Sequence, residues 1–313
     1  MRIFMIGLAL VAGLAALAAA QDPTPRGRIA LSFDDAPRGQ GPVYSGAERA
    51  EALIETLRAV NAPPVVFFVK TEGLETEEGR ARIRAYGEAG HLIANHTNSH
   101  DWLSRTDIDA YLADIDLAET RLDGMPNRRP WFRFPYLDEG MPREKRDAVR
   151  TALTERGLRN GYVTVDNYDW YIESLWQSAV RDGRDVDEQA LGAAYVDMLI
   201  GAVEFYDALA ITALGRSPDH VILLHENDLA ARFAGDLIEA LRARGWTLIS
   251  PDEAYADPIA AIAPETLMTR QGQIGALAVE AGIAPSTLTH RAIEEAQIEA
   301  LLEERQVFSA PGR

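Results

Sequence analysis

Short apolar runs, rich in β-branched and aromatic residues, recur along the chain between turn-forming and polar residues. Seven of these runs predict β-strands, at 29–33, 65–69, 91–95, 131–134, 161–165, 221–225 and 246–250. Several contain almost no polar residue, which is typical of strands that are covered on both faces. We therefore expect a sheet that is buried between helices.

Helical spacing of apolar positions fills the segments between the runs. It predicts five helices, at 47–60, 75–90, 106–123, 143–157 and 229–245. Several of them end at a glycine, as at Gly157 and Gly245, which is a common C-terminal stop. A longer pattern predicts a helix over 194–215, which we expect to form a wall or lid within the connection 171–217. Residues 286–305 predict a terminal helix.

Strands and helices alternate along most of the chain. This alternation favours a parallel sheet, and seven repeats favour a barrel of the (β/α) kind. An open, doubly wound sheet is the alternative. The sequence becomes rich in Ala and Glu after Pro251. We therefore expect the main domain to cover 28–256 and a helical C-terminal extension to cover 257–313.

The composition narrows the classes of function. Of the 313 residues, 47% are hydrophobic, so the chain can bury a large core. The formal net charge is -17, and no dense Lys/Arg cluster offsets the repulsion from phosphates, so nucleic acid is not an expected partner. Because the chain has no cysteine, any bound metal must use histidine and carboxylate ligands.

The first 20 residues have the layout of a secretory signal peptide, with one Arg, an apolar stretch and three alanines before Gln21. Residues 21–27 would then form a linker. An uncleaved membrane anchor is the alternative, and membrane contact is expected only in that case, although the apolar stretch is near the lower limit for spanning a bilayer. Both interpretations place the folded part outside the cytoplasm, either periplasmic or secreted.

Residues able to do chemistry follow the ends of several predicted strands. They are Asp34, Asp35, His96, His100, Arg133, Tyr136, Asp166, Asp169, Trp170 and His225. In barrels of this kind, reactive residues gather at the carboxyl ends of the strands. The pattern therefore predicts that these side chains share one site.

His96 and His100 are four residues apart, a spacing that can direct two imidazoles at one metal ion, although a polar turn also explains it. The HExxH pattern of zincins is absent, because Thr97 follows the first histidine. A carboxylate, Asp34 or Asp35, could supply a third ligand and leave a position open for water. Without a metal, the two aspartates would simply begin a turn.

His225 ends a buried run, where it is either structural or a general acid whose ring Asp169 orients and keeps charged. Near Asp34, the planar fork of Arg133 would keep that carboxylate ionised and oriented. The remaining histidines are expected to be structural, and they are His91, His220 and His290.

Taken in order, the segments SFDDAP, NHTNSH, RFPY, DNYDW and LLH resemble the five motifs of the polysaccharide deacetylase family, also known as the NodB-homology domain or carbohydrate esterase family 4. The similarity extends from about Arg28 to Ala256. It implies a distorted (β/α)7 barrel that removes N-acetyl or O-acetyl groups from a carbohydrate in a metal-dependent reaction. An acetylated glycan would then be the substrate.

The resemblance also implies a catalytic role for several motif residues. Asp34 would be the general base, and Arg133 would orient it. His225 would protonate the leaving group, with its pKa tuned by Asp169. The backbone N–H of Tyr136 would help to stabilise the oxyanion.

The same resemblance implies that Asp35, His96 and His100 bind the metal and that Trp170 and Tyr136 contact the substrate. Zinc is the first expectation for the divalent ion, and Co, Mn and Fe(II) are compatible with the same ligands. In this chain Ala36 replaces the family's usual glycine, and its methyl group could shift the loop or narrow the cleft. The long connection 171–217 also departs from the family and could reshape the substrate groove.

Two other functions stay open. The first is a secreted carbohydrate-binding protein on a deacetylase fold. Such a protein should lack at least one key motif residue, and this chain retains Asp34, Asp35, His96, His100 and His225. The second is phosphoryl transfer at an acidic metal site, which would need a basic phosphate clamp, and Arg133 is the only obvious candidate.

Overall fold

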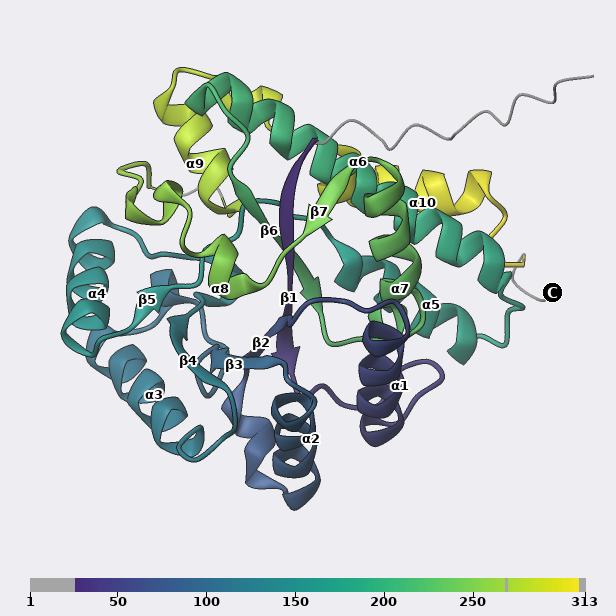
Figure 1. The fold of residues 1–313 in the computed structure, drawn as a ribbon, viewed down its shortest axis with the longest axis horizontal. Coiled ribbons are helices and arrows are strands. Elements are labelled where there is room, and N and C mark those ends of the chain that lie inside the picture. The colour runs from purple at the N-terminus through teal and green to yellow at the C-terminus, as the bar shows by residue number, and fades with distance from the viewer. Residues whose placement is uncertain (1–25, 268–269, 310–313) are drawn as a thin grey trace, which may run out of the picture.

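The structure, a computed structural model, describes residues 26–267 and 270–309 (Figure 1). The predicted signal peptide, 1–20, and the linker up to residue 25 lie outside the described residues. Across the described ranges, no helix combines the length and the apolar character needed to cross a membrane.

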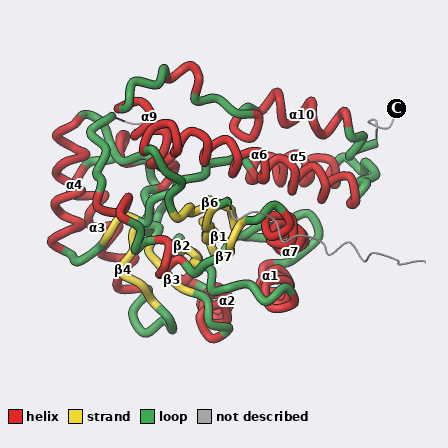
Figure 2. Tube along the Cα trace, turned by 45° about the horizontal axis from the view of Figure 1, so that its top comes forward, coloured by secondary structure: helices red, strands yellow, loops and turns green. Residues whose placement is uncertain are grey.

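One parallel sheet lies at the centre of the described residues (Figures 1 and 2). Its strands are neighbours in the order β5-β4-β3-β2-β1-β6, and β7 pairs with β1. The strands are β1 (Gly27–Ala36), β2 (Val66–Val69), β3 (Leu92–Asn95), β4 (Arg128–Phe132), β5 (Arg159–Asn160), β6 (Asp219–His225) and β7 (Trp246–Leu248). Every pairing between them is parallel, so their carboxyl ends meet at one edge.

The sheet closes on itself through the segment that follows β5. The N–H groups of Thr164 and Val165 both donate to the carbonyl of Val221 in β6, at 3.0 and 3.1 Å. The carbonyl of Val165 accepts from the N–H of Leu223 at 3.0 Å. These bonds bridge the gap between the two edges and confirm the predicted distorted barrel of parallel strands.

The strand predicted over 161–165 is displaced, because β5 ends just before it. The carbonyls of Gly161 and Tyr162 accept from the guanidinium of Arg133, at 2.7 and 3.4 Å, and so do not take part in the sheet. This segment therefore passes over Arg133 as irregular chain before it pairs with β6.

Helices cover the sheet, as the alternation predicts. In chain order they are α1 (Gly46–Ala59), α2 (Glu77–Glu88), α3 (Ile108–Arg121), α4 (Arg143–Glu155), α5 (Asp169–Arg181), α6 (Glu188–Leu214), α7 (Asp228–Ala243) and α8 (Pro251–Ala254). Figure 2 shows α5 and α6 on one side of the strands and α2 on the other. Helix α5 is not predicted from the sequence, because Asp169 and Trp170 in its first turn closely follow a predicted strand.

The long helix predicted over 194–215 is α6. Its N-terminus is capped by Asp187, which accepts from the N–H of Ala190 at 2.9 Å, and it ends at Gly215, whose φ of 73° terminates the helix. The helix packs against α7 and its inward side chains are buried. It is therefore part of the wall of the molecule.

The residues after 256 form a helical extension that folds back onto the barrel, with α9 (Gly272–Glu280) and α10 (Glu295–Glu304). The N–H of Gln273 donates to the carbonyl of Val163 at 2.8 Å, and the N–H of Tyr168 donates to the carbonyl of Ala292 at 2.7 Å. The terminal helix predicted over 286–305 is wrong in its first half, because that part of the chain runs along the barrel to make the second of these bonds.

Candidate active site

The carboxyl ends of the strands open into a cleft of about 500 Å³. Its lining residues are Asp34, Asp35, Arg38, His96, His100, Trp102, Tyr136, Leu137, Asp166, Asn167, Tyr168, Trp170, Leu223, His225 and Arg270. Two further predicted residues, Arg133 and Asp169, lie directly behind this lining and contact Asp34 and His225. The structure thus brings all the predicted site residues together.

Asp34 ends β1 beside His225 of β6, its partner in the strand register. Its side chain is buried, and Arg133 Nη1 donates to its Oδ1 at 2.6 Å. The guanidinium also donates to the hydroxyls of Ser32 and Tyr255, at 2.8 and 2.9 Å. Because a charge-assisted hydrogen bond is short and directional, Arg133 holds the Asp34 carboxylate in one orientation.

Asp35, His96 and His100 form a second group beside Asp34. The ligand atoms that they offer all lie within 4.8 Å of one another. The Nδ1 of His96 lies 2.9 Å from the carbonyl oxygen of Arg133. Because a carbonyl can only accept, Nδ1 carries the proton and Nε2 keeps a free lone pair, the arrangement expected of a metal-ligating imidazole.

The three residues fit a divalent cation. The buried Oδ1 of Asp35 lies 3.1 Å from His100 Nε2 and 3.7 Å from His96 Nε2, yet accepts no well-aligned hydrogen bond among the described residues, which is costly unless a positive charge lies next to it. Burial favours a higher pKa for Asp35, but the adjacent histidines outweigh burial and hold this pKa well below its usual range. Burial lowers the pKa of His96 to about 4, so its ring is neutral at neutral pH, as ligation requires.

The backbone that presents these ligands adopts conformations that non-glycine residues rarely populate. Asp35, Thr97 and His100 have φ of 67°, 64° and 66°. The turn is fixed by side chains, since the N–H of Thr97 donates to Asn95 Oδ1 at 2.7 Å and the N–H of His100 donates to Thr97 Oγ1 at 2.9 Å. Local strain of this kind clusters at functional sites, where it directs side chains.

His225 lies across the cleft from the possible metal ligands. Its Nδ1 is 2.6 Å from Asp169 Oδ1, and its backbone N–H donates to Asp169 Oδ2 at 2.9 Å. The side chain of Asn227 donates to the same Oδ2 at 3.1 Å. Burial opposes the charged ring, but the fully buried Asp169 carboxylate outweighs burial and raises the pKa of His225. The Nε2 of His225 is thereby suited to donate a proton.

Aromatic side chains surround the cleft opening. Tyr136 has φ of 58°, and no acceptor for its backbone N–H lies among the described residues. Its ring stacks on Trp102, with centroids 4.0 Å apart and planes 8° from parallel. Trp170, in the first turn of α5, is 36% exposed and Tyr136 is 43% exposed. Such exposed flat rings can pack on the apolar face of a sugar.

Several lining residues have no role predicted from the sequence, among them Arg38, Trp102 and Arg270, and Asp166 is predicted to share the site without a stated role. Burial raises the pKa of Asp166 to about 7. Arg38 forms an ion pair with Asp35, at 3.3 Å between Nη1 and Oδ2. Arg38 and Trp102 are near the motif residues in sequence, which could have identified them, whereas no local pattern connects Arg270 with the cleft.

The Ala36 methyl group does not narrow the cleft, contrary to the expectation from sequence. Its side chain is fully buried in the core. The three histidines expected to be structural lie outside the cleft lining. His220, for example, is buried between Thr164 Oγ1 and Asp207 Oδ1, at 3.0 and 3.2 Å.

Comparisons with known proteins agree with the motifs. Residues 21–160 match the family model described as polysaccharide deacetylase. The peptidoglycan-N-acetylglucosamine deacetylase of Bacillus cereus is 26% identical over 148 residues, which are 47% of this chain and 48% of that protein. The chain thus spans about half the length of this curated relative.

Two solved structures are similar to this chain at low identity. A mutant of a CE4 family pseudoenzyme with restored enzymatic activity has a TM-score of 0.50 and 16% identity, and the match covers 74% of this chain and 72% of that one. The family 4 carbohydrate esterase from Streptomyces lividans, in complex with acetate, has a TM-score of 0.46 and 20% identity over 74% of this chain and 97% of that one. Residues 21–160 are thus similar to the polysaccharide deacetylase family, and the barrel is shared with a solved structure of the CE4 family.

Proposed function

We propose that this chain is a metal-dependent hydrolase that removes N-acetyl or O-acetyl groups from an extracytoplasmic polysaccharide or oligosaccharide. One observation carries the proposal: a single cleft holds an oriented carboxylate, a group of three possible metal ligands and, opposite them, a histidine paired with a buried aspartate. The extracytoplasmic location rests on the sequence of residues 1–20.

Hydrolysis of an acetyl amide or ester needs an activated nucleophile, a stabilised tetrahedral intermediate and a protonated leaving group. Asp35, His96 and His100 would hold the divalent ion. When bound, such an ion supplies Lewis acidity, which polarises an acetyl carbonyl and lowers the pKa of a water to about 7. Zn suits two histidines and a carboxylate, and Co, Mn or Fe(II) can use the same ligands.

Asp34 would accept the proton of the attacking water. Arg133 occupies its Oδ1, which leaves Oδ2 facing the ligand group, 3.6 Å from His96 Nε2. Arg133 acts only through Asp34 and is therefore a positioning residue. The arrangement supplies a base whose position is set before the substrate binds.

His225 would give a proton to the departing nitrogen or oxygen, because Asp169 stabilises its charged form. The Tyr136 N–H would donate to the developing oxyanion, a contribution of about 2.7–4 kcal/mol for a donor of this kind. The exposed rings of Trp170 and Tyr136 would contact the acetyl group and its sugar.

A non-catalytic carbohydrate-binding protein is the less favoured alternative. The fold alone does not distinguish an enzyme from a binding protein, since one solved structure with this fold is described as a mutant of a pseudoenzyme with restored enzymatic activity. In this chain, however, the base, the three possible ligands and the acid are all present and lie around one cleft. A binding protein would have no use for a buried carboxylate oxygen that accepts no well-aligned hydrogen bond beside two imidazoles.

The proposal is tested by acetate release from a panel of acetylated glycans, including peptidoglycan, chitin oligomers and acetylated xylan. The protein is stripped of metal with a chelator, and each divalent ion is then restored separately. We expect release from at least one glycan only after an ion is restored. If no glycan yields acetate with any ion, the proposal is wrong and the binding function is favoured.

A further inference from the structure

Two arginine side chains from distant parts of the chain lie on one tryptophan at the cleft. The guanidinium carbon of Arg105 is 4.7 Å from the ring centre of Trp102, and that of Arg270 is 5.2 Å from it. Arg105 ends the short helical turn Leu103–Arg105, just after the NHTNSH motif, whereas Arg270 belongs to the C-terminal extension. Trp102 and Arg270 both line the cleft. The extension thus contributes a cation to the site.

Neither of these arginines forms an ion pair with a carboxylate of the described residues, although most arginines there do, as Arg38 does with Asp35. The acidic residue nearest to Arg105 in sequence, Asp107, instead caps α3 and accepts from the N–H of Asp109 at 3.0 Å. The positive charges of Arg105 and Arg270 are therefore not neutralised by an internal partner.

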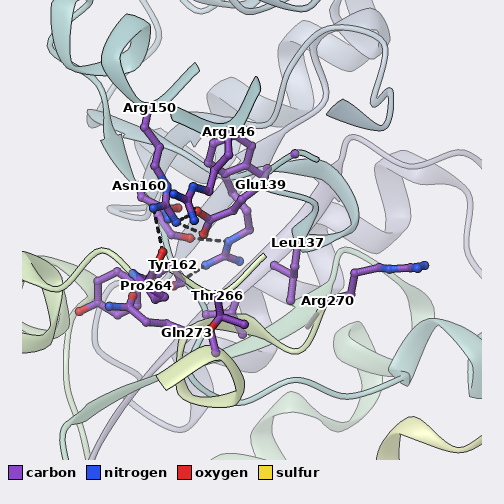
Figure 3. Close-up of a pocket in the computed structure, with 17 residues that line it drawn as sticks. Leu137, Glu139, Arg146, Arg150, Asn160, Tyr162, Pro264, Thr266, Arg270 and Gln273 are labelled. Atoms are coloured by element: carbon purple, nitrogen blue, oxygen red, sulfur yellow. Dashed lines mark hydrogen bonds and ion pairs between the residues drawn. The ribbon is translucent and has the colours of Figure 1, made fainter. Parts of the chain in front are cut away.

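The arginines of the neighbouring cavity show the contrast. Arg150 is paired with Glu139 at 2.5 Å, and Arg146 donates to the carbonyl of Glu265 at 2.7 Å. Figure 3 shows that the side chain of Arg270 points away from this paired group. The guanidinium of Arg270 is thus separate from the structural ion pairs that join α4 to the extension.

The backbone next to Arg270 is held firmly against the barrel. Gly272 has φ of 71°, and a Cβ there would lie only 2.5 Å from the carbonyl oxygen of Val163. The next residue, Gln273, donates its N–H to the same carbonyl at 2.8 Å and its side-chain amide to the carbonyl of Ile259 at 2.7 Å. These contacts position the extension beside the segment that leads to the cleft.

Two unpaired cations beside one ring repel each other weakly, and a bound anion would replace this repulsion by attraction. Their distances from Trp102 place the guanidinium carbons of Arg105 and Arg270 within about 10 Å of each other, a separation near the screening length at 0.1 M salt. The guanidinium fork matches carboxylate and phosphate groups in two-point hydrogen bonding. A local pair of cations would also offset the repulsion that a chain of net charge -17 exerts on an anionic polymer.

We propose that Arg105 and Arg270 form an anion subsite at the cleft, which selects acetylated glycans that carry a carboxylate or phosphate group near the acetylated sugar. The proposal rests on the proposed function, because it assigns the substrate class of the same cleft. Arg270 would be a specificity-determining residue supplied by the extension, and Trp102 would hold both guanidinium groups in place by cation–π contact.

The test compares kcat/KM for three acetylated oligosaccharides of equal length: a neutral one, one with a uronic acid carboxylate and one with a phosphate. We expect the native protein to prefer an anionic glycan, and the better of the two identifies the anion. Arg105→Gln and Arg270→Gln should each lower this preference about three- to tenfold and leave the neutral glycan unchanged, as for contacts of partly solvated charges. Arg270→Lys should restore part of it, and added salt should reduce it.

The matched control is Arg84→Gln, which removes one exposed arginine from α2 and changes the net charge equally. The proposed anion subsite is wrong if the native protein has equal kcat/KM for all three glycans, or if both the Arg105 and Arg270 variants retain the preference for an anionic glycan. In either case, acetate release would still support the proposed deacetylase function. If no glycan releases acetate, the proposed function fails. The subsite is then decided by calorimetric binding of the same glycans, whose Kd ratio must fall in the two cleft variants.

Discussion

Replacing Arg133 with methionine should lower the free energy of unfolding by about 3–5 kcal/mol, because it leaves the buried Asp34 carboxylate without its partner. The side chains of Arg133 and Asp34 are only 1% and 5% exposed, and Nη1 lies 2.6 Å from Oδ1. Methionine is unbranched and apolar, so it fills most of the space of the arginine stem without supplying a charge.

The energetic contribution of the ion pair must be distinguished from that of the other contacts of Arg133. The guanidinium also donates to the Gly161 carbonyl at 2.7 Å and to the Tyr255 hydroxyl at 2.9 Å. A double-mutant cycle with Asp34→Asn does this, because asparagine is neutral and is not left as an unpaired charge. Arg133→Met should therefore cost less in the Asp34→Asn background, with a coupling energy of about 1.5–3 kcal/mol.

The assay is urea unfolding of metal-free protein, followed by tryptophan fluorescence, since the chain has five tryptophans. The four proteins of the cycle must share one m-value, which shows that they expose similar surface on unfolding. If the two substitutions are additive within about 0.5 kcal/mol, the pair does not orient Asp34 through a strong buried interaction, and the reasoning is refuted.

Three further predictions concern the acid, the buried network and the metal. Asp169→Asn removes the charge that raises the pKa of His225, so this pKa should fall. The alkaline limb of the pH profile of kcat/KM should then move to lower pH, and a limb that does not move would exclude His225 as the general acid. Glu226→Gln weakens the 2.8 Å ion pair with buried Arg82 and should lower stability by about 1–3 kcal/mol in urea unfolding, whereas an unchanged midpoint would contradict a structural role. Restoring the metal at a hundred times its Kd should raise stability by about 2.7 kcal/mol in the native protein but not in Asp35→Asn, and equal gains in both would place the ion elsewhere.

Much of the barrel follows from local sequence patterns. The strands at 65–69, 91–95 and 221–225 are short apolar runs with buried side chains on both faces, and each is found within one or two residues of its predicted position. The strands β1 to β5 are neighbours in their sequence order, as expected for consecutive strands joined by helices. The carboxyl ends therefore meet, and this explains why motif residues that are distant in sequence share one cleft.

Local patterns fail where tertiary contacts replace the sheet or the helix. The apolar run 161–165 has the composition of a strand, but its first carbonyls bind Arg133, which comes from another part of the chain. Residues 286–294 have helical spacing, but the carbonyl of Ala292 is used by Tyr168. In both segments, a hydrogen-bond partner that is distant in sequence determines the conformation of the backbone.

The site residues also divide into those that local sequence patterns predict and those that they do not. Asp34, His96 and His225 could be predicted because they follow strands that the apolar pattern identifies. Arg270 could not, since it reaches the cleft only through the packing of the extension on Val163 and the contact with Trp102. Contacts of this kind leave no periodic signal in the sequence.

The central claim is that two adjacent aspartates divide the chemistry, with Asp34 accepting a proton and Asp35 binding the metal. Asp34→Asn and Asp35→Asn differ from the native protein by the same change of one atom in each carboxylate. The decisive measurement is metal content by elemental mass spectrometry together with acetate release, both from the same preparations of the two variants. We expect Asp34→Asn to keep its metal and lose nearly all turnover, whereas Asp35→Asn should lose both. Retained turnover in Asp34→Asn, or full metal content in Asp35→Asn, would contradict it.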